Sequence, residues 1–109
     1  MNDHDIIAHG KIAVAQFALV EIDGAIWGRL ELTLLAGDAT ALLSDIMIDL
    51  SALSRNDPSA VLFPSGAPIT PDRIWELTWL LLPHLRLLTR ARVVPLEETL
   101  RLSLAALEL

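Results

Sequence analysis

"KIAVAQFALVEIDGAIWGRLELTLL", residues 11–35, decides the fold. Asp23-Gly24 separates two apolar runs, and this pair favours a two-residue hairpin turn because such a turn requires positive φ at both central residues. A helix through residues 6–19 is the alternative for the first run, since alanine-rich stretches fit either structure. We predict two antiparallel strands joined at Asp23-Gly24.

The two-residue turn also predicts which side chains share a face, because side chains alternate along a strand. One face is apolar and is expected to be core: Ala13, Ala15, Phe17 and Leu19 opposite Leu34, Leu32, Leu30 and Gly28. The other face mixes polar and apolar residues. It carries Trp27, which we expect to be half exposed.

The spacing of apolar residues changes in residues 37–54. Apolar residues recur there at intervals of three and four, which predicts a helix: Leu42, Leu43, Ile46, Met47, Leu50 and Leu53. Asp38 or Thr40 can serve as its N-cap. Asp45 and Asp49 lie four residues apart on the opposite side, and we interpret them as a solvated helix face rather than a metal site.

Residues 55–71 are rich in proline, glycine and serine and are predicted to form a long loop. Loops of this length are uncommon in compact domains. The apolar centre, Val61-Leu62-Phe63, either pairs as a short edge strand or presents Phe63 to a partner.

A second helix is predicted to begin after the loop. Thr70 is a suitable N-cap and Pro71 suits the first helical position. Because a proline disfavours helical backbone at the residue before it, we expect this helix to end near Leu82, before Pro83.

Beyond Pro83, apolar residues alternate over residues 84–93 and again over residues 99–109, which predicts a second hairpin. A helix from Pro95 is the alternative, because leucine, alanine and glutamate favour helix. The expected fold is α+β: a small two-layer domain in which two β-hairpins form an antiparallel sheet with two helices, in the order ββα-loop-αββ. Residues 1–10 are expected to be a flexible N-terminal tail and residues 11–109 a single domain.

Composition limits the function classes. The net charge is −6, and residues 1–54 contribute all of it, with eight acidic and two basic residues. An acidic chain is a poor ligand for nucleic acid or an anionic membrane, so we expect neither as a partner. The chain is cysteine-free, which excludes disulfides and thiolate metal sites and favours a cytoplasmic location.

Motifs that carry chemistry are missing from the sequence. There is no phosphate-binding glycine loop, dinucleotide fingerprint or zinc-protease motif. His4 and His9 are interpreted as solvated, and His84 as structural. We therefore predict no catalytic residue, no cofactor and no bound metal. The sequence favours a protein that is not an enzyme.

The second helix suggests an interface instead. Ile74, Leu77 and Leu81 form one apolar stripe, and a further stripe contains Trp75, Trp79 and Leu82. A helix that covers a sheet needs only one such stripe, and tryptophan is frequent at binding hot spots.

The second hairpin would carry a basic stripe that an acidic partner could neutralise, since like charges on a sheet face repel. This stripe consists of Arg86, Arg90, Arg92 and Arg101.

These observations predict a non-catalytic protein–protein interaction module that self-associates, most simply as a homodimer, of the chaperone, adaptor or inhibitor type. The expected interface consists of Trp75, Trp79, Leu82, Trp27 and Phe63 with the four arginines. The alternative is a small enzyme or ligand-binding domain with an apolar pocket between helices and sheet. His84, Asp45 or Glu76 would then orient the ligand or transfer protons.

Overall fold

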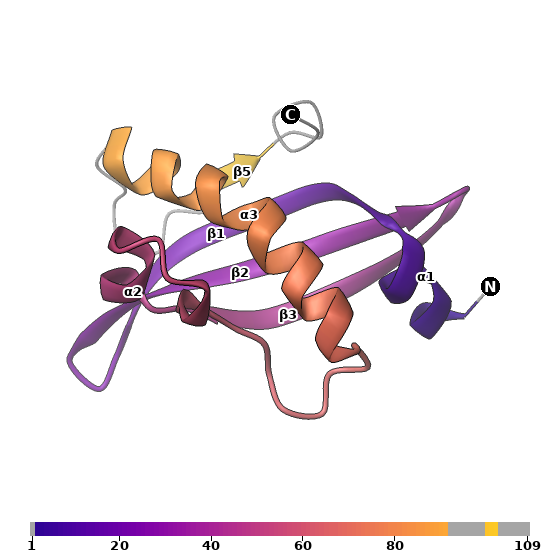
Figure 1. Cartoon of the computed structure of the whole chain (residues 1–109), viewed down its shortest axis with the longest axis horizontal. Helices are drawn as coiled ribbons and strands as arrows, with labels where there is room; N and C mark the ends of the chain where they lie inside the picture. The colour runs from indigo at the N-terminus through magenta and orange to yellow at the C-terminus, as the bar shows by residue number, and fades with distance from the viewer. Residues whose placement is uncertain (1, 92–99, 103–109) are drawn as a thin grey trace.

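The computed structural model describes residues 2–91 and 100–102. The helices are α1 (Asp3–His9), α2 (Leu50–Ser54) and α3 (Pro71–Ala91), with the 3-10 turn η1 (Pro58–Ala60). The strands are β1 (Lys11–Ile22), β2 (Ala25–Ala36), β3 (Ala39–Ile48), β4 (Val61–Leu62) and β5 (Leu100–Leu102), and they form one sheet in the order β4-β3-β2-β1-β5. Figure 1 shows α3 lying diagonally across one face of the curled sheet, with α1 and α2 towards opposite ends. The α+β class is confirmed, whereas the order ββα-loop-αββ is wrong.

The first hairpin is confirmed. Ile22 pairs with Ala25 across Asp23-Gly24, and both turn residues have positive φ, 51° and 82°. Phe17 lies opposite Leu30, as the two-residue turn predicts. The register shifts by one residue at the far end, between Ile12 and Val14, so that Ile12 replaces Ala13 opposite Leu34. The alternative of a helix through residues 6–19 is wrong for β1.

The helix predicted over residues 37–54 is wrong, because residues 39–48 form strand β3. Its register with β2 shifts between Leu30 and Leu32, and Asp45 in this bulge has a φ of 59°. The extra residue lets Leu43 and Ile46 both face the core, although they are three residues apart. An interrupted strand thus reproduced the spacing of a helix.

Asp49 follows β3 directly and is the N-cap of α2. Its carboxylate accepts hydrogen bonds from the N–H groups of Ser51 and Ala52 at 3.0 and 3.2 Å. The loop that follows returns to the sheet. Val61 pairs with Ile48, and Leu62 pairs with Met47. The edge-strand interpretation of this loop is confirmed.

Helix α3 begins as predicted and ends nine residues later than predicted, at Ala91. The hydroxyl of Thr70 accepts a hydrogen bond from the Arg73 N–H at 3.2 Å, so Thr70 is the N-cap. The helix continues through Pro83, which is exposed, while Leu81, Leu82 and Leu85 are fully buried. Burial of each leucine contributes about 1.5–3 kcal/mol. Together they offset the roughly 3 kcal/mol that a proline costs in a helix. The strand predicted over residues 84–93 is therefore wrong for residues 84–91, which are helical.

Strand β5 occupies part of the predicted second hairpin but has a different partner. Leu100–Leu102 pair antiparallel with Ala15–Phe17 of β1. The alternative C-terminal helix is therefore wrong at these three positions. Residues 92–99 and 103–109 of the predicted hairpin, which include Arg92, lie outside the described residues.

The N-terminal residues assigned to a flexible tail contain helix α1, which packs onto the domain. Ile6 and Ile7 are each 2% exposed and belong to the hydrophobic core. The chain turns sharply at Gly10, where an added Cβ would lie 2.5 Å from the Ile6 carbonyl oxygen. This close approach accounts for glycine between α1 and β1.

The core lies between α3 and the covered face of the sheet. It contains Phe17, Leu30 and Ile46 from the strands, together with Leu77 and Leu81 from α3. Within the described part of the chain, no helix is both long and apolar enough to cross a membrane.

Candidate functional site

The side of α3 that points away from the sheet carries five exposed apolar residues, with the exposed Glu76 among them. Trp75 is 59% exposed, Leu87 66%, and Trp79 and Leu80 39% each, and Pro83 is exposed between them. We call these five residues the outer strip of α3. The opposite side of the helix carries the buried leucines, so one helix presents apolar surface both to its own core and to solvent. The exposed apolar residues on this side make it the candidate interaction site.

The two tryptophans of the outer strip contact each other. Trp75 and Trp79 are one helical turn apart, their ring centroids are 5.5 Å apart, and the ring planes meet at 73°. Edge-to-face aromatic pairs of this geometry contribute about 0.5–1.5 kcal/mol beyond their burial. Each ring therefore restrains the other, and the strip offers a preformed aromatic surface.

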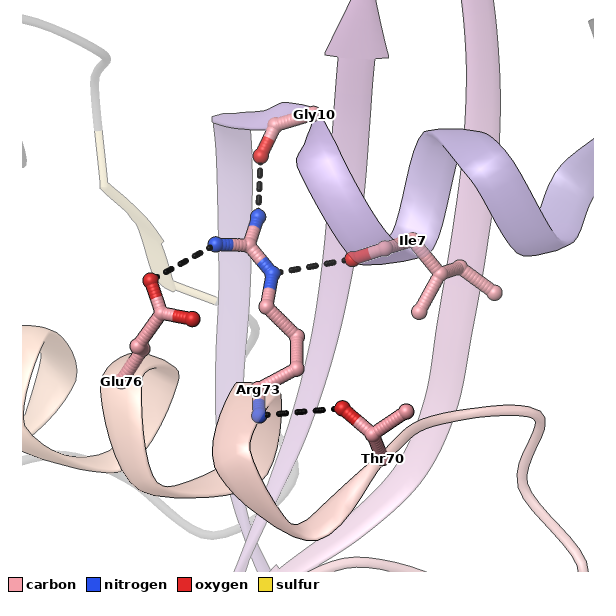
Figure 2. A network of polar contacts seen from close by, with 5 residues as sticks. All are labelled: Ile7, Gly10, Thr70, Arg73 and Glu76. Carbon is pink, nitrogen blue, oxygen red and sulfur yellow. Dashed lines mark hydrogen bonds and ion pairs between the residues drawn. The ribbon is translucent and has the colours of Figure 1, made fainter.

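The first turn of α3 is fixed to the N-terminal segment by Arg73 (Figure 2). Its Nε donates a hydrogen bond to the carbonyl oxygen of Ile7 at 2.9 Å, and its Nη2 donates to that of Gly10. The third nitrogen, Nη1, lies 3.6 Å from the Glu76 carboxylate. The guanidinium thereby binds the carbonyls at the end of α1 and holds the first part of the outer strip in place.

Charges are divided along α3. Asp72 and Glu76 lie near its start, and the Glu76 side chain is 64% exposed. Arg86 lies three turns after Glu76, is half-buried, and its Nε has no hydrogen-bond partner among the described residues. The outer strip is consequently bordered by carboxylates at one end and by a guanidinium at the other.

The predicted site residues on α3 have different positions in the structure. Trp75 and Trp79 lie on the outer strip, whereas Leu82 is fully buried in the core and is not available to a second chain. Leu82 lies on the same side of the helix as Leu85, which the sheet covers.

The basic stripe expected on a sheet face is wrong for Arg86 and Arg90, because these two residues belong to helix α3. Arg101 lies in β5 opposite Gln16. Arg92 lies outside the described residues.

Sequence reasoning missed Leu80, Pro83 and Leu87. Pro83 lies four residues after Trp79, Leu87 lies four residues after Pro83, and Leu80 lies three residues before Pro83, which places them on one helix side. For Pro83 and Leu87 that signal was lost because the helix was expected to end before Pro83, whereas Leu80 lay within the predicted helix and was overlooked.

A second surface lies on the face of the sheet that α3 does not cover. It brings together Trp27 and Phe63, which the sequence analysis named as separate interface residues. Trp27 and Phe63 line a hollow of about 720 Å³ together with Ile22, Met47 and Leu62. Its charged lining residues are Asp23 and Asp45. We call this the apolar hollow.

The described residues contain no group of three or more histidine, aspartate or glutamate side chains that can hold a metal ion. Asp49 is engaged as a cap, and Glu76 faces Arg73. Hydrogen bonds from Ser59 lower the pKa of Asp57, with the nearby Arg55 charge as a weaker cause. Asp57 accepts from the Ser59 N–H at 2.9 Å, so its lowered pKa reflects the capping of η1 rather than a catalytic role.

In comparisons with known proteins, no family model, curated protein or solved structure matches this chain.

Proposed function

We propose that this protein is a non-catalytic interaction module that self-associates through the outer strip of α3. The observation that supports the proposal is the solvent exposure of the Trp75–Trp79 pair beside further exposed apolar residues of α3. Tryptophan side chains carry a large share of binding energy where interfaces bury them. A small acidic module of this kind fits a chaperone, adaptor or inhibitor role.

The size of the strip sets the expected affinity. From Trp75 to Leu87 it is about 18 Å long, at 1.5 Å per residue, and a helix is about 10 Å wide. This footprint of about 180 Å² is well below the roughly 800 Å² that each partner buries in a standard interface. We therefore expect a weak, reversible dimer.

The test is the mass of the protein in solution, measured by sedimentation velocity at concentrations from micromolar to millimolar. The wild type is expected to shift from monomer to dimer as concentration rises. Trp75→Ser and Trp79→Ser are expected to stay monomeric. Leu42→Ser is the matched control, because Leu42 is 60% exposed on β3 and outside the outer strip. A wild type that is monomeric throughout, or a Trp79→Ser variant that dimerises like the wild type, contradicts the proposal.

Tryptophan fluorescence provides a second readout. In a Trp27→Phe background the emission comes from Trp75 and Trp79 alone, since the chain has three tryptophans. Dimerisation through the outer strip is expected to shift this emission to shorter wavelength as concentration rises. An unchanged emission in a sample that does dimerise would place the interface elsewhere.

The apolar hollow supports a second candidate, a ligand-binding domain. Its lining combines exposed apolar side chains with Asp23 and Asp45, so it suits an apolar molecule that carries a positive charge. Of the three polar groups considered from the sequence, only Asp45 lines it. Thermal stabilisation by cationic amphiphiles, lost in Phe63→Asp and retained in Trp79→Ser, is the expected result for this function. Equal stabilisation of both variants contradicts it.

A further inference from the structure

We infer that two copies of the protein pair along α3 in antiparallel orientation, with the acidic end of each helix beside the basic end of the other. This inference rests on the proposed self-association and adds its geometry. It follows from the order of charged and apolar residues along the exposed side of α3.

The charges on α3 distinguish the two orientations. Asp72 and Glu76 precede the middle of the outer strip, and Arg86 follows it. A parallel pair would place carboxylates beside carboxylates and guanidinium groups beside guanidinium groups, which repel. An antiparallel pair places Glu76 of one copy level with Arg86 of the other, which attract.

A single twofold axis satisfies the charges and the apolar contacts together. Glu76 and Arg86 are five residues on either side of position 81, and Trp75 and Leu87 are six residues on either side. Trp79 and Pro83 are two residues on either side. An axis at position 81 therefore sets each tryptophan level with an apolar residue of the second copy and each carboxylate level with a guanidinium. Such a self-complementary contact is what twofold symmetry requires.

The shapes of the residues at this axis permit close approach. Pro83 has a short, compact side chain, so the Trp79 ring of the second copy can lie over it at the interaxial distance of about 8–10 Å that packed helices adopt. Arg86 is already half-buried, and its Nε lacks a partner among the described residues. Because this Nε atom is enclosed within its own chain, a carboxylate from the second copy would bind the terminal Nη groups of Arg86.

The absence of cysteine from the sequence makes the orientation directly measurable. Glu76→Cys and Leu87→Cys replace exposed side chains on the same side of α3. In the antiparallel pair, position 76 of one copy and position 87 of the other are offset along the helix by about 1.5 Å. The two copies of position 76 are offset by about 15 Å, and the two copies of position 87 by about 18 Å. Both of these offsets exceed the limit of roughly 7 Å between Cα atoms for a disulfide.

Each variant is oxidised alone and as an equal mixture in which one variant carries an affinity tag. The expected result is a disulfide-linked dimer in the mixture and little from either variant alone. Efficient linkage of each variant to itself, with little in the mixture, indicates parallel helices and overturns this inference while the proposed self-association stands. A wild type that does not dimerise in sedimentation overturns both.

Charge exchange provides a measurement that does not depend on oxidation. Glu76→Lys alone and Arg86→Glu alone are each expected to weaken dimerisation, and an equal mixture of the two is expected to restore it through opposite charges. Circular dichroism melts of each variant establish that it is folded before it is mixed. Two folded variants that remain monomeric in the mixture contradict the antiparallel register.

Discussion

Replacing Arg73 with methionine removes every donor of the network in Figure 2 that the side chain supplies, while keeping an extended side chain of similar reach. The Arg73 side chain is 14% exposed, so methionine retains most of the apolar contact that the arginine stem makes. What is lost is the pair of hydrogen bonds to the carbonyl oxygens of Ile7 and Gly10. Those two carbonyls then remain at the end of α1 with reduced access to water.

A hydrogen bond to a charged group contributes about 1.5–3 kcal/mol to stability. The two carbonyls are only part-buried, so water replaces some of the loss, and we expect Arg73→Met to reduce the free energy of unfolding by about 2–4 kcal/mol. For a domain of about this size, each kcal/mol lowers the melting temperature by roughly 4–8 °C. The contact with Glu76 adds little, because that carboxylate is 64% exposed and exposed ion pairs contribute about 0–1 kcal/mol.

The assay is urea unfolding followed by circular dichroism, together with amide hydrogen exchange in α1. Glu76→Gln is the matched control and is expected to change the free energy of unfolding by less than about 1 kcal/mol. Arg73→Met is also expected to speed exchange in α1 more than in β2, because the hydrogen bonds tie α1 to α3. If Arg73→Met costs no more than Glu76→Gln, the guanidinium does not hold α1 in place and this reasoning is refuted.

Three further changes test other parts of the fold. Gly28→Ala places a Cβ 2.6 Å from Phe17 Cε2 and 2.9 Å from Ile48 Cβ, and we expect a loss of about 1–3 kcal/mol in urea unfolding. Pro83→Ala restores a helix N–H at an exposed position and is expected to raise the melting temperature, because proline is about 3 kcal/mol less favourable than alanine within a helix. The pKa of the Asp57 carboxyl is lowered by folding, so its contribution is complete above the ordinary aspartate range and is lost as pH falls through the lowered value. Unfolding of the wild type and of Asp57→Asn at a series of pH values is therefore expected to show a stability difference that shrinks in acid.

The first hairpin was predictable because its information is local. Asp23-Gly24 specifies the turn, and the alternation on either side specifies the faces, so Phe17 and Leu30 were correctly set opposite each other. The bulge near Ile12 carries no comparable signal in the sequence. It changes only the last two pairs of the ladder, and the core face stays apolar.

Strand β3 was not predictable by periodicity alone. Its inward positions change parity at the bulge, from Leu43 to Ile46, so the apolar spacing matches a helix turn. The polar pair Ser44-Asp45 at the change of parity is the local signal, because aspartate tolerates the left-handed conformation that a bulge can require. What selects the strand is pairing with β2, which lies outside any local window.

Prediction of the candidate site was limited for the same reason: contacts between residues far apart in the sequence decide which side of α3 is buried. Pro83 disfavours helix locally, but the sheet buries Leu81, Leu82 and Leu85 on both sides of it, and this burial exists only once the sheet has formed. Ending the helix at Pro83 removed Leu87 from the predicted surface, and helical spacing from Trp75 and Trp79 assigned Leu82 to it. The sheet decides which side of α3 is covered, and the side that remains carries Trp75 and Trp79. A tryptophan pair in a sequence can thus suggest that an interface exists, whereas its extent and its charge order follow from the packing of the whole domain.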